Sequence, residues 1–301
     1  MKTQINNKAP YIPKKWESVN CPFCDANKPK LYERFGSELQ YSYVLCTNCG
    51  LVYTNPRPAY DQDFIDAAYA SYYQYADNLK VEDLDHINQS SLKMFEREVA
   101  YIVQYDKVRE AVLDIGSGMG TFLLAAKKYY PGKAVGLDVS VQMAQFVEKN
   151  IGVKVHIAQF DEYFPDEKYS LIHMSHVLEH VPDPNRWLQH ARGLLTKNGV
   201  LVINVPNKFG IGNRMQHLFY RAGLKKQFAN GWSDPSRTPD HLFEPTLKSM
   251  KYLLKKNGFE ILEHYTYSRK DPVSNSTLPS RVLNRWLKKG TNLAFITRPL
   301  K

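Results

Sequence analysis

The stretch AVLDIGSGMGTF, residues 111–122, decides the fold. An apolar run ends at Asp114 and is followed by glycines at 116, 118 and 120, the pattern of a buried strand that leads through a tight turn into a helix. A dinucleotide fingerprint reads G-x-G-x-x-G, whereas here Thr121 stands where the third glycine would be. The carboxylate of Asp114 would repel a pyrophosphate but would attract an ammonium or sulfonium group.

Apolar runs and helical patterns alternate on either side of this turn. The runs cover 111–115, 134–138, 153–157, 170–174 and 200–205. Such alternation predicts a mostly parallel sheet with helices on both faces. Asp138 ends the second run, where an acid can accept hydrogen bonds from both ribose hydroxyls. The sequence therefore predicts a cationic nucleoside ligand without phosphates.

The four cysteines form two C-x-x-C pairs near the N-terminus. Two such knuckles can complete a tetrahedral four-thiolate zinc site, and the intervening segments 31–36 and 39–46 are predicted to be the strands of a hairpin. Disulfides are the competing interpretation, but they are rare in a cytosolic chain. We therefore expect a closed, structural zinc site with the ligands Cys21, Cys24, Cys46 and Cys49.

The order of these motifs resembles that of class I S-adenosylmethionine (SAM)-dependent methyltransferases. The resemblance covers about residues 90–300 and rests on D-x-G-x-G-x-G from Asp114, then Asp138, YSLIHMSHVLEHVPDP and GVLVINVPN. It implies an α/β, Rossmann-like, doubly wound sheet of seven strands whose last, antiparallel strand is NLAFITRPL (292–300). It also implies that SAM is bound by Asp114, Gly116, Ser117, Gly118, Gly120, Asp138, Val139, Met143, Gln159, Phe160 and Ser175.

The cysteine segment and DHLFEPTLKSMKYLLKKNGF (240–259) are similar to a subgroup with an N-terminal zinc ribbon, whose members often act in bacterial cell-surface glycan or nucleotide-sugar pathways. We expect a zinc-ribbon module over 1–58, a helical lead-in over 59–106 and a methyltransferase domain over 107–301. An unusually long connection, 206–243, is expected to be an acceptor lid.

The motif SHVLEH (175–180) offers the candidate catalytic groups. If a helix begins near Ser175, His176, Glu179 and His180 share one face. Either histidine could remove the acceptor's proton, with Glu179 orienting it. The H-x-x-E-H spacing also matches a zinc-protease motif, but Pro182 and Pro184 would interrupt the long helix that such a protease needs. The alternative is that Glu179 and His180 only brace the cofactor loop.

The expected lid carries basic and aromatic side chains that could hold an anionic acceptor or stack on a sugar or base. His241, in PDHLF, is a further candidate base. Solvated charges and aromatics that fasten the lid to the sheet are the alternative interpretation. These side chains are Arg214, Arg221, Lys225, Lys226, Arg237, Phe219, Tyr220, Phe228 and Trp232.

Composition limits the partners. A chain of 301 residues with 43% hydrophobic residues can bury a large core, and its net charge of +10 favours anionic partners. Without a signal peptide or a transmembrane-length apolar run, a cytoplasmic location is expected. The basic stretch SRVLNRWLKKG (280–290) could rest on an anionic membrane or pack on the sheet.

Four functions compete. The leading one is SAM-dependent methylation, at oxygen, of a small-molecule or glycan acceptor such as a nucleotide sugar or lipid-linked saccharide. The others are a zinc-ribbon RNA methyltransferase, which the positive charge would suit, a sugar C-methyltransferase, and a scaffold that binds partners without catalysis. The intact turn from Asp114 to Gly120 argues against the scaffold.

Overall fold

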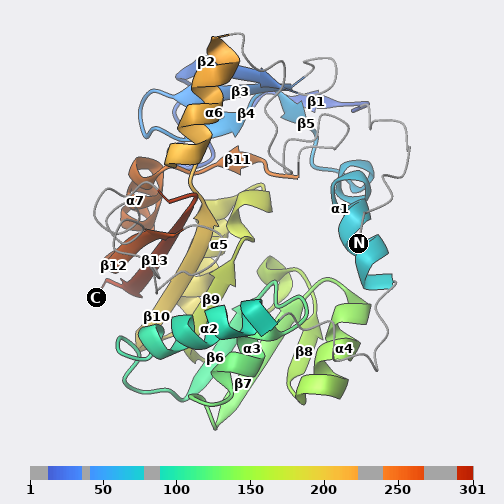
Figure 1. The fold of residues 1–301 in the computed structure, drawn as a ribbon, viewed down its shortest axis with the longest axis vertical. Helices are drawn as coiled ribbons and strands as arrows, with labels where there is room; N and C mark the ends of the chain where they lie inside the picture. The colour runs from blue at the N-terminus through green and yellow to red at the C-terminus, as the bar shows by residue number, and fades with distance from the viewer. Residues whose placement is uncertain (1–12, 36–40, 78–88, 223–239, 268–289, 301) are drawn as a thin grey trace.

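The computed structural model describes residues 13–35, 41–77, 89–222, 240–267 and 290–300 (Figure 1). A seven-stranded sheet occupies the centre, in the order β12-β13-β10-β9-β6-β7-β8. The strands β6, β7, β8, β9 and β10 are parallel to one another, and β13 runs antiparallel to both β10 and β12. The predicted sheet and its antiparallel last strand are confirmed. The strands are β6 (Ala111–Ile115), β7 (Lys133–Asp138), β8 (Lys154–Ile157), β9 (Tyr169–Ser175), β10 (Leu195–Pro206), β12 (Phe259–Tyr267) and β13 (Asn292–Pro299).

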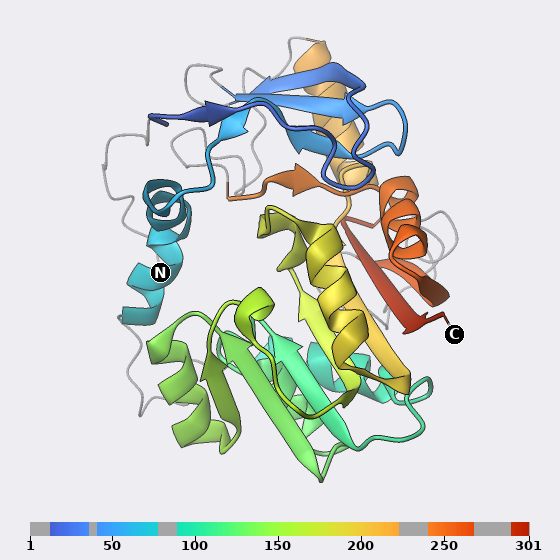
Figure 2. The ribbon, with the colours of Figure 1, turned by 180° about the vertical axis from the view of Figure 1, so that it is seen from behind.

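Helices cover both faces of this sheet, as Figures 1 and 2 show from opposite sides. Side chains alternate along a strand, so Leu201 and Ile203 of β10 join the core beneath α5 and α7, while Val200 and Val202 join the core beneath α2 and α3. Because both faces are buried, the strands have continuous apolar sequences. The helices are α2 (Gln89–Ile102), α3 (Thr121–Ala126), α4 (Val141–Ile151), α5 (Pro184–Leu194) and α7 (Leu247–Lys256).

The cysteine segment folds into a small sheet above the carboxyl end of the large one (Figure 1). β2 (Pro29–Phe35) and β3 (Tyr41–Cys46) form the expected antiparallel hairpin, and β4 (Val52–Thr54) pairs with β3. The fourth strand, β11 (Phe243–Glu244), comes from the far end of the long connection and pairs with β4. Residues 13–60 also contain the short pair β1 (Trp16–Glu17) and β5 (Arg57–Pro58).

The small sheet shares one core with the large domain. Buried Phe23, Cys46 and Leu51 belong to the same apolar cluster as Phe243 and Met250. The rings of Phe23 and Phe243 meet edge to face at 5.0 Å. The cysteine module is therefore packed on α5, α7 and β11 and is not a freely tethered unit.

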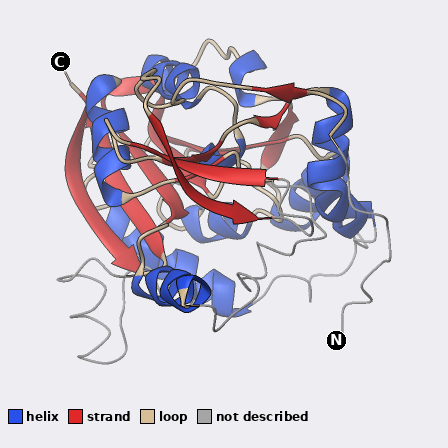
Figure 3. Cartoon of the chain, turned by 90° about the horizontal axis from the view of Figure 1, so that it is seen from above, coloured by secondary structure: helices blue, strands red, loops and turns tan. Residues whose placement is uncertain are grey.

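Two further helices flank the carboxyl edge of the large sheet. α1 (Gln62–Asp77) belongs to the expected helical lead-in and runs down one side of the molecule, away from the C-terminal strands (Figure 1). α6 (Ile211–Arg221) stands beside the small sheet. Figure 3, a view from above, shows the small sheet lying across the end of the large one. None of the described helices is long and apolar enough to cross a membrane.

Candidate active site

The glycine turn has the backbone geometry that the sequence predicts. Gly116, Gly118 and Gly120 all have positive φ, which side chains rarely adopt. A Cβ on Gly116 would lie 2.5 Å from Val177 Cγ2, whereas a Cβ on Gly118 would meet nothing within 4 Å. The turn therefore packs tightly at its first glycine and leaves open space at its second. Ser117 lies between them, and its buried Oγ has no hydrogen-bond partner among the described residues.

Asp138, at the end of β7, is joined to this turn. Its Oδ2 accepts a hydrogen bond from the Gly118 amide at 2.8 Å, and its Oδ1 accepts from the Ser140 amide at 2.9 Å and from the Tyr72 hydroxyl at 3.0 Å. Burial raises the pKa of this carboxyl. Tyr72 lies on α1, so the helical lead-in reaches the predicted ribose site, a contact that no local motif signals.

Asp114 is buried within the large sheet. It is 3% exposed, and its Oδ1 lies 2.7 Å from Nδ1 of His173 on the neighbouring strand β9. The His173 ring stacks on Phe122 at 3.6 Å, and the Asp114 carboxylate raises the pKa of His173. The Asp114 carboxylate is therefore already paired with a side chain of the protein, His173. Its predicted contact with the cofactor stays a prediction.

The predicted adenine side has one exposed and one buried residue. Gln159 is exposed directly after β8, while Phe160 is 1% exposed and packs against Trp187 of α5 at 5.2 Å. Val139 is 36% exposed at the mouth of the turn. Met143 is buried in α4, and Ser175 is half-buried at the end of β9.

The catalytic candidates follow β9, but not on the helix we expected from Ser175. His176 has φ of 54°, and its amide donates to the Asn204 carbonyl of β10 at 2.8 Å, so the chain turns in the left-handed region before a short 3-10 turn, η3 (Leu178–His180). That expectation was wrong because this hydrogen bond continues the strand pairing past Ser175. His176 and Glu179 nevertheless meet, with Nδ1 and Oε1 3.1 Å apart.

His180 and His241 complete a cluster around Glu179. Their rings meet edge to face at 4.8 Å, although 60 residues separate them in the chain. The Nδ1 of His180 donates to the Asp240 carbonyl at 2.8 Å, and Nδ1 of His241 lies 3.2 Å from Glu244 Oε1. Glu179 is fully buried, and the hydrogen bond from His176 and the neighbouring histidines lower its pKa to about 2. The structure thus brings together all four predicted catalytic residues.

The four cysteines also converge. The Sγ atoms of Cys21 and Cys49 are 3.5 Å apart, those of Cys24 and Cys46 are 3.6 Å apart, and all four lie within 4.8 Å of one another. Four thiolates at about 2.3 Å from one zinc ion would be separated by about 3.8 Å, so the cluster has the dimensions of such a site. None of the four is in a disulfide.

The two knuckles have the same backbone geometry. The Asp25 amide donates to the Cys21 carbonyl at 2.8 Å, and the Gly50 amide donates to the Cys46 carbonyl at 2.9 Å. Asp25 and Gly50 both have positive φ. This turn aims two thiols from each knuckle at one point, as metal binding requires.

Part of the expected lid lies outside the described residues, including Lys225, Lys226, Phe228, Trp232 and Arg237. Of the others, Arg214 and Phe219 are exposed on α6. Arg221 and Tyr220 end that helix, and their side chains are also not described. Nearly all of the basic stretch 280–290 falls outside the described part of the chain as well.

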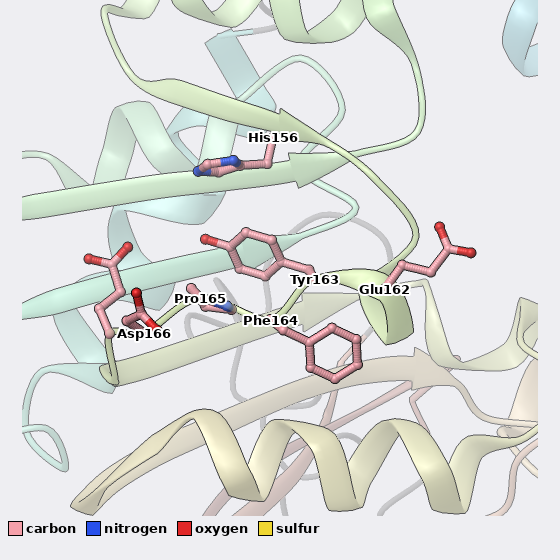
Figure 4. Close-up of a pocket in the computed structure, with 7 residues that line it drawn as sticks. His156, Glu162, Tyr163, Phe164, Pro165 and Asp166 are labelled. Atoms are coloured by element: carbon pink, nitrogen blue, oxygen red, sulfur yellow. The ribbon is translucent and has the colours of Figure 1, made fainter.

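A pocket of about 420 Å³ lies elsewhere, beside β8 and the segment that leads to β9 (Figure 4). Figure 4 shows His156 next to Tyr163, and the centroids of their rings are 5.0 Å apart. None of the predicted catalytic, cofactor or cysteine residues lines this pocket. It therefore supplies no part of the site described above.

Comparison with known proteins identifies the family. A family model described as a methyltransferase domain matches residues 84–264. The chain belongs to this methyltransferase family. The cysteine segment precedes the matched region, so the match does not extend to it. The prediction of a methyltransferase is confirmed at this level.

Two relatives are similar over part of the chain. An uncharacterized protein of Methanocaldococcus jannaschii is 29% identical over 119 residues, which are 38% of this chain and 55% of that protein. A ubiquinone biosynthesis O-methyltransferase of Histophilus somni is 32% identical over 108 residues, 32% of this chain and 45% of the relative. The matches span about half the length of these relatives.

Solved methyltransferase structures share the fold. A Burkholderia thailandensis 1,6-didemethyltoxoflavin-N1-methyltransferase with bound S-adenosylhomocysteine (SAH) aligns with a TM-score of 0.51 and 14% identity, covering 91% of this chain and all of that one. A magnesium protoporphyrin IX methyltransferase of Synechocystis PCC 6803 aligns with a TM-score of 0.50 and 14% identity, over 79% and 97% of the two chains. At these identities the likeness concerns the fold alone.

Proposed function

We propose that this methyltransferase transfers the methyl group of SAM to an oxygen atom of a small anionic acceptor, with a nucleotide sugar or lipid-linked saccharide as the leading class. The observation that carries the proposal is the His176–Glu179 pair, which stands directly beside the glycine turn. Val177 lies between the two residues and is the side chain that a Cβ on Gly116 would strike. A base held there can reach an acceptor that faces the cofactor.

The turn and the end of β7 suit SAM. The open space at Gly118, the unpartnered Ser117 Oγ and the Asp138 carboxylate give a small-residue cradle with one buried polar atom and one acid. We assign the methionine part to Gly116, Ser117, Gly118 and Gly120, and the ribose to Asp138. SAM supplies a methyl group that its positive sulfur has already activated.

Positioning the acceptor and removing its proton are the tasks left to the protein. His176 Nδ1 donates to Glu179, which leaves Nε2 to accept the acceptor's hydroxyl proton, and the side chain is 44% exposed. The acceptor oxygen then forms its bond to the methyl carbon as the carbon–sulfur bond breaks, and the electron pair of that bond goes to sulfur. We assign His180, His241 and Glu179 to positioning, and residues 206–243 to the acceptor's cover.

Three observations favour oxygen and an anionic acceptor. A histidine–carboxylate base suits a hydroxyl, whose proton must be removed for transfer. The ubiquinone biosynthesis enzyme among the relatives is named an O-methyltransferase. The chain carries a net charge of +10, which favours anionic ligands. We further propose one zinc ion, bound by the four cysteines in a purely structural role.

The test combines calorimetry with product detection. Full-length protein is titrated with SAM, SAH and, as a control, NAD, and SAH release is then followed with nucleotide sugars, lipid-linked saccharides and RNA. We expect binding of SAM and SAH but not NAD. His176→Gln should keep SAH affinity and lose about 10²- to 10⁴-fold in turnover, whereas His156→Gln, in the separate pocket of Figure 4, should be unaffected. Salt-sensitive RNA binding with RNA-dependent SAH release would replace the saccharide acceptor with RNA.

A further inference from the structure

The cluster of Glu179, His180 and His241 has a composition that general base catalysis alone does not need. Each residue offers one ligand atom, and these three atoms lie within 4.8 Å of one another. Two imidazoles and one carboxylate form the donor set that binds divalent transition metals while leaving coordination positions open. The cluster is separate from the cysteines and comes from two distant parts of the chain.

One carboxylate oxygen points into the cluster without a hydrogen bond. Glu179 is fully buried, its Oε1 is bonded to His176, and its Oε2 has no hydrogen-bond partner among the described residues. A buried carboxylate oxygen without a hydrogen bond lowers the stability of the folded protein. A cation bound at Oε2 would satisfy it.

The histidines are held in the orientation that metal ligands require. A ligating histidine usually donates its second ring N–H to a carbonyl or carboxylate, which fixes the tautomer and leaves the other nitrogen to bind. His180 donates from Nδ1 to the Asp240 carbonyl, and His241 donates from Nδ1 to Glu244. In His180 this places the coordinating lone pair on Nε2, and in His241 a metal ion would bind Nε2 in place of its proton. All three groups are thus oriented by a second partner, since His176 does the same for Glu179.

We propose that Glu179 Oε2, His180 Nε2 and His241 Nε2 bind one divalent transition-metal ion, distinct from the zinc ion assigned to the cysteines. Ligand distances near 2.1 Å would bring the three atoms to about 3.0–3.4 Å from one another, a movement that side-chain rotation supplies. Three protein ligands leave at least one open position for an oxygen of the acceptor.

The inference rests on the proposed function and deepens it. An ion at this place would hold an acceptor oxygen next to His176 and lower the pKa of its hydroxyl. It would also select acceptors with a hydroxyl, phenolate or carboxylate oxygen able to bind a metal. The acceptor class is therefore an oxygen chelator, which includes the saccharides proposed above.

The experiment measures metal content of the full-length protein. Protein stripped of metal is reloaded with Co²⁺, and bound cobalt is counted by mass spectrometry and followed by absorption. We expect two ions per chain, one with thiolate-to-cobalt charge transfer and one with only the weak bands of a nitrogen and oxygen site. His241→Ala and Glu179→Gln should bind one ion and keep the thiolate signal, because losing a ligand should weaken the site by more than about 100-fold.

Two further variants guard against a folding artefact. Glu244→Gln alters the group that orients His241 without removing a ligand, and it should weaken binding of the second ion by about 10- to 100-fold. His156→Gln removes a histidine outside the cluster and should keep both ions. One ion per chain in the wild type, or two ions in His241→Ala, would overturn the proposal.

An SAH titration of the same samples separates this inference from the proposed function. If the protein holds one cobalt ion and binds SAH, the second metal site is ruled out and the methyltransferase assignment stands. Two cobalt ions without SAH binding would support the metal site while contradicting the proposed cofactor. Two ions together with SAH binding support both.

Discussion

Replacing Gly118 with alanine tests the cofactor cradle more sharply than replacing any acidic residue. The added Cβ would meet nothing within 4 Å, so the substitution creates no clash with the protein. The remaining cost is backbone strain at φ of 49°, about 1–2 kcal/mol for a residue with a side chain. A loss of 1 kcal/mol lowers the melting temperature of a domain of this size by only about 2–4 °C.

The same methyl group should damage cofactor binding severely. The space at Gly118 is the part of the turn that we assign to the methionine end of SAM, so a methyl group there would compete with the ligand directly. We expect Gly118→Ala to weaken SAH binding by at least about tenfold, which corresponds to about 1.4 kcal/mol. Calorimetry with SAH and thermal unfolding without ligand give the two quantities independently.

Two other glycine-to-alanine substitutions serve as controls for Gly118→Ala. Gly193 also has open space around its missing side chain but lies in α5, so Gly193→Ala should raise stability by up to about 1 kcal/mol and leave SAH affinity unchanged. Gly116→Ala would place its Cβ 2.5 Å from Val177 and should lose more stability than Gly118→Ala. Wild-type SAH affinity in a folded Gly118→Ala protein would refute the placement of the cofactor.

Three further predictions follow from other contacts. Asp138→Asn should weaken SAH binding by about tenfold or more, because hydrogen bonds to a charged group contribute about 1.5–3 kcal/mol; unchanged affinity in calorimetry would remove the ribose assignment. Asp114 raises the pKa of His173, so this pair should stabilise the fold fully below about pH 6.5 and progressively less as pH rises through the folded-state pKa. The unfolding free energy should therefore fall from about pH 6 to alkaline pH, and His173→Gln should lack that decline, although it is less stable throughout. Cys49→Ser should lose one metal ion and accelerate hydrogen exchange in β4 and β11 while β6 and β7 keep their protection; equal exchange in all four strands would contradict a local role for the knuckles.

The large sheet could be predicted because its information is local. Runs such as 111–115 and 134–138 are apolar except for one aspartate each, Asp114 and Asp138, since both faces of a parallel strand are buried. The glycine turn is encoded in five consecutive residues. The cysteine pairs are equally local, because a C-x-x-C knuckle fixes its own turn. The structure contains the strands, the glycine turn and the cysteine knuckles that the sequence predicts.

The contacts that shape the candidate site are not local. Tyr72 reaches Asp138 across 66 residues, and His180 meets His241 across 61 positions of chain, including segments with no regular motif. Periodicity cannot reveal such pairs. The prediction of a helix from Ser175 failed for a related reason. The His176 amide donates to the carbonyl of Asn204 in β10, a residue far along the chain, and so continues the strand pairing.

The pairing of β11 with β4 connects the cysteine module to the cluster around Glu179. The Thr54 amide of β4 donates to the Leu242 carbonyl at 3.1 Å, and the Leu242 amide donates to the Glu179 carbonyl at 2.9 Å. His241 lies two residues before this short strand, and Glu244 is its last residue. The knuckles fix β3 and β4, these fix β11, and β11 fixes His241 against Glu179. The structural zinc ion that we propose at the knuckles would therefore act on the reaction through position alone, by holding one wall of the proposed acceptor site.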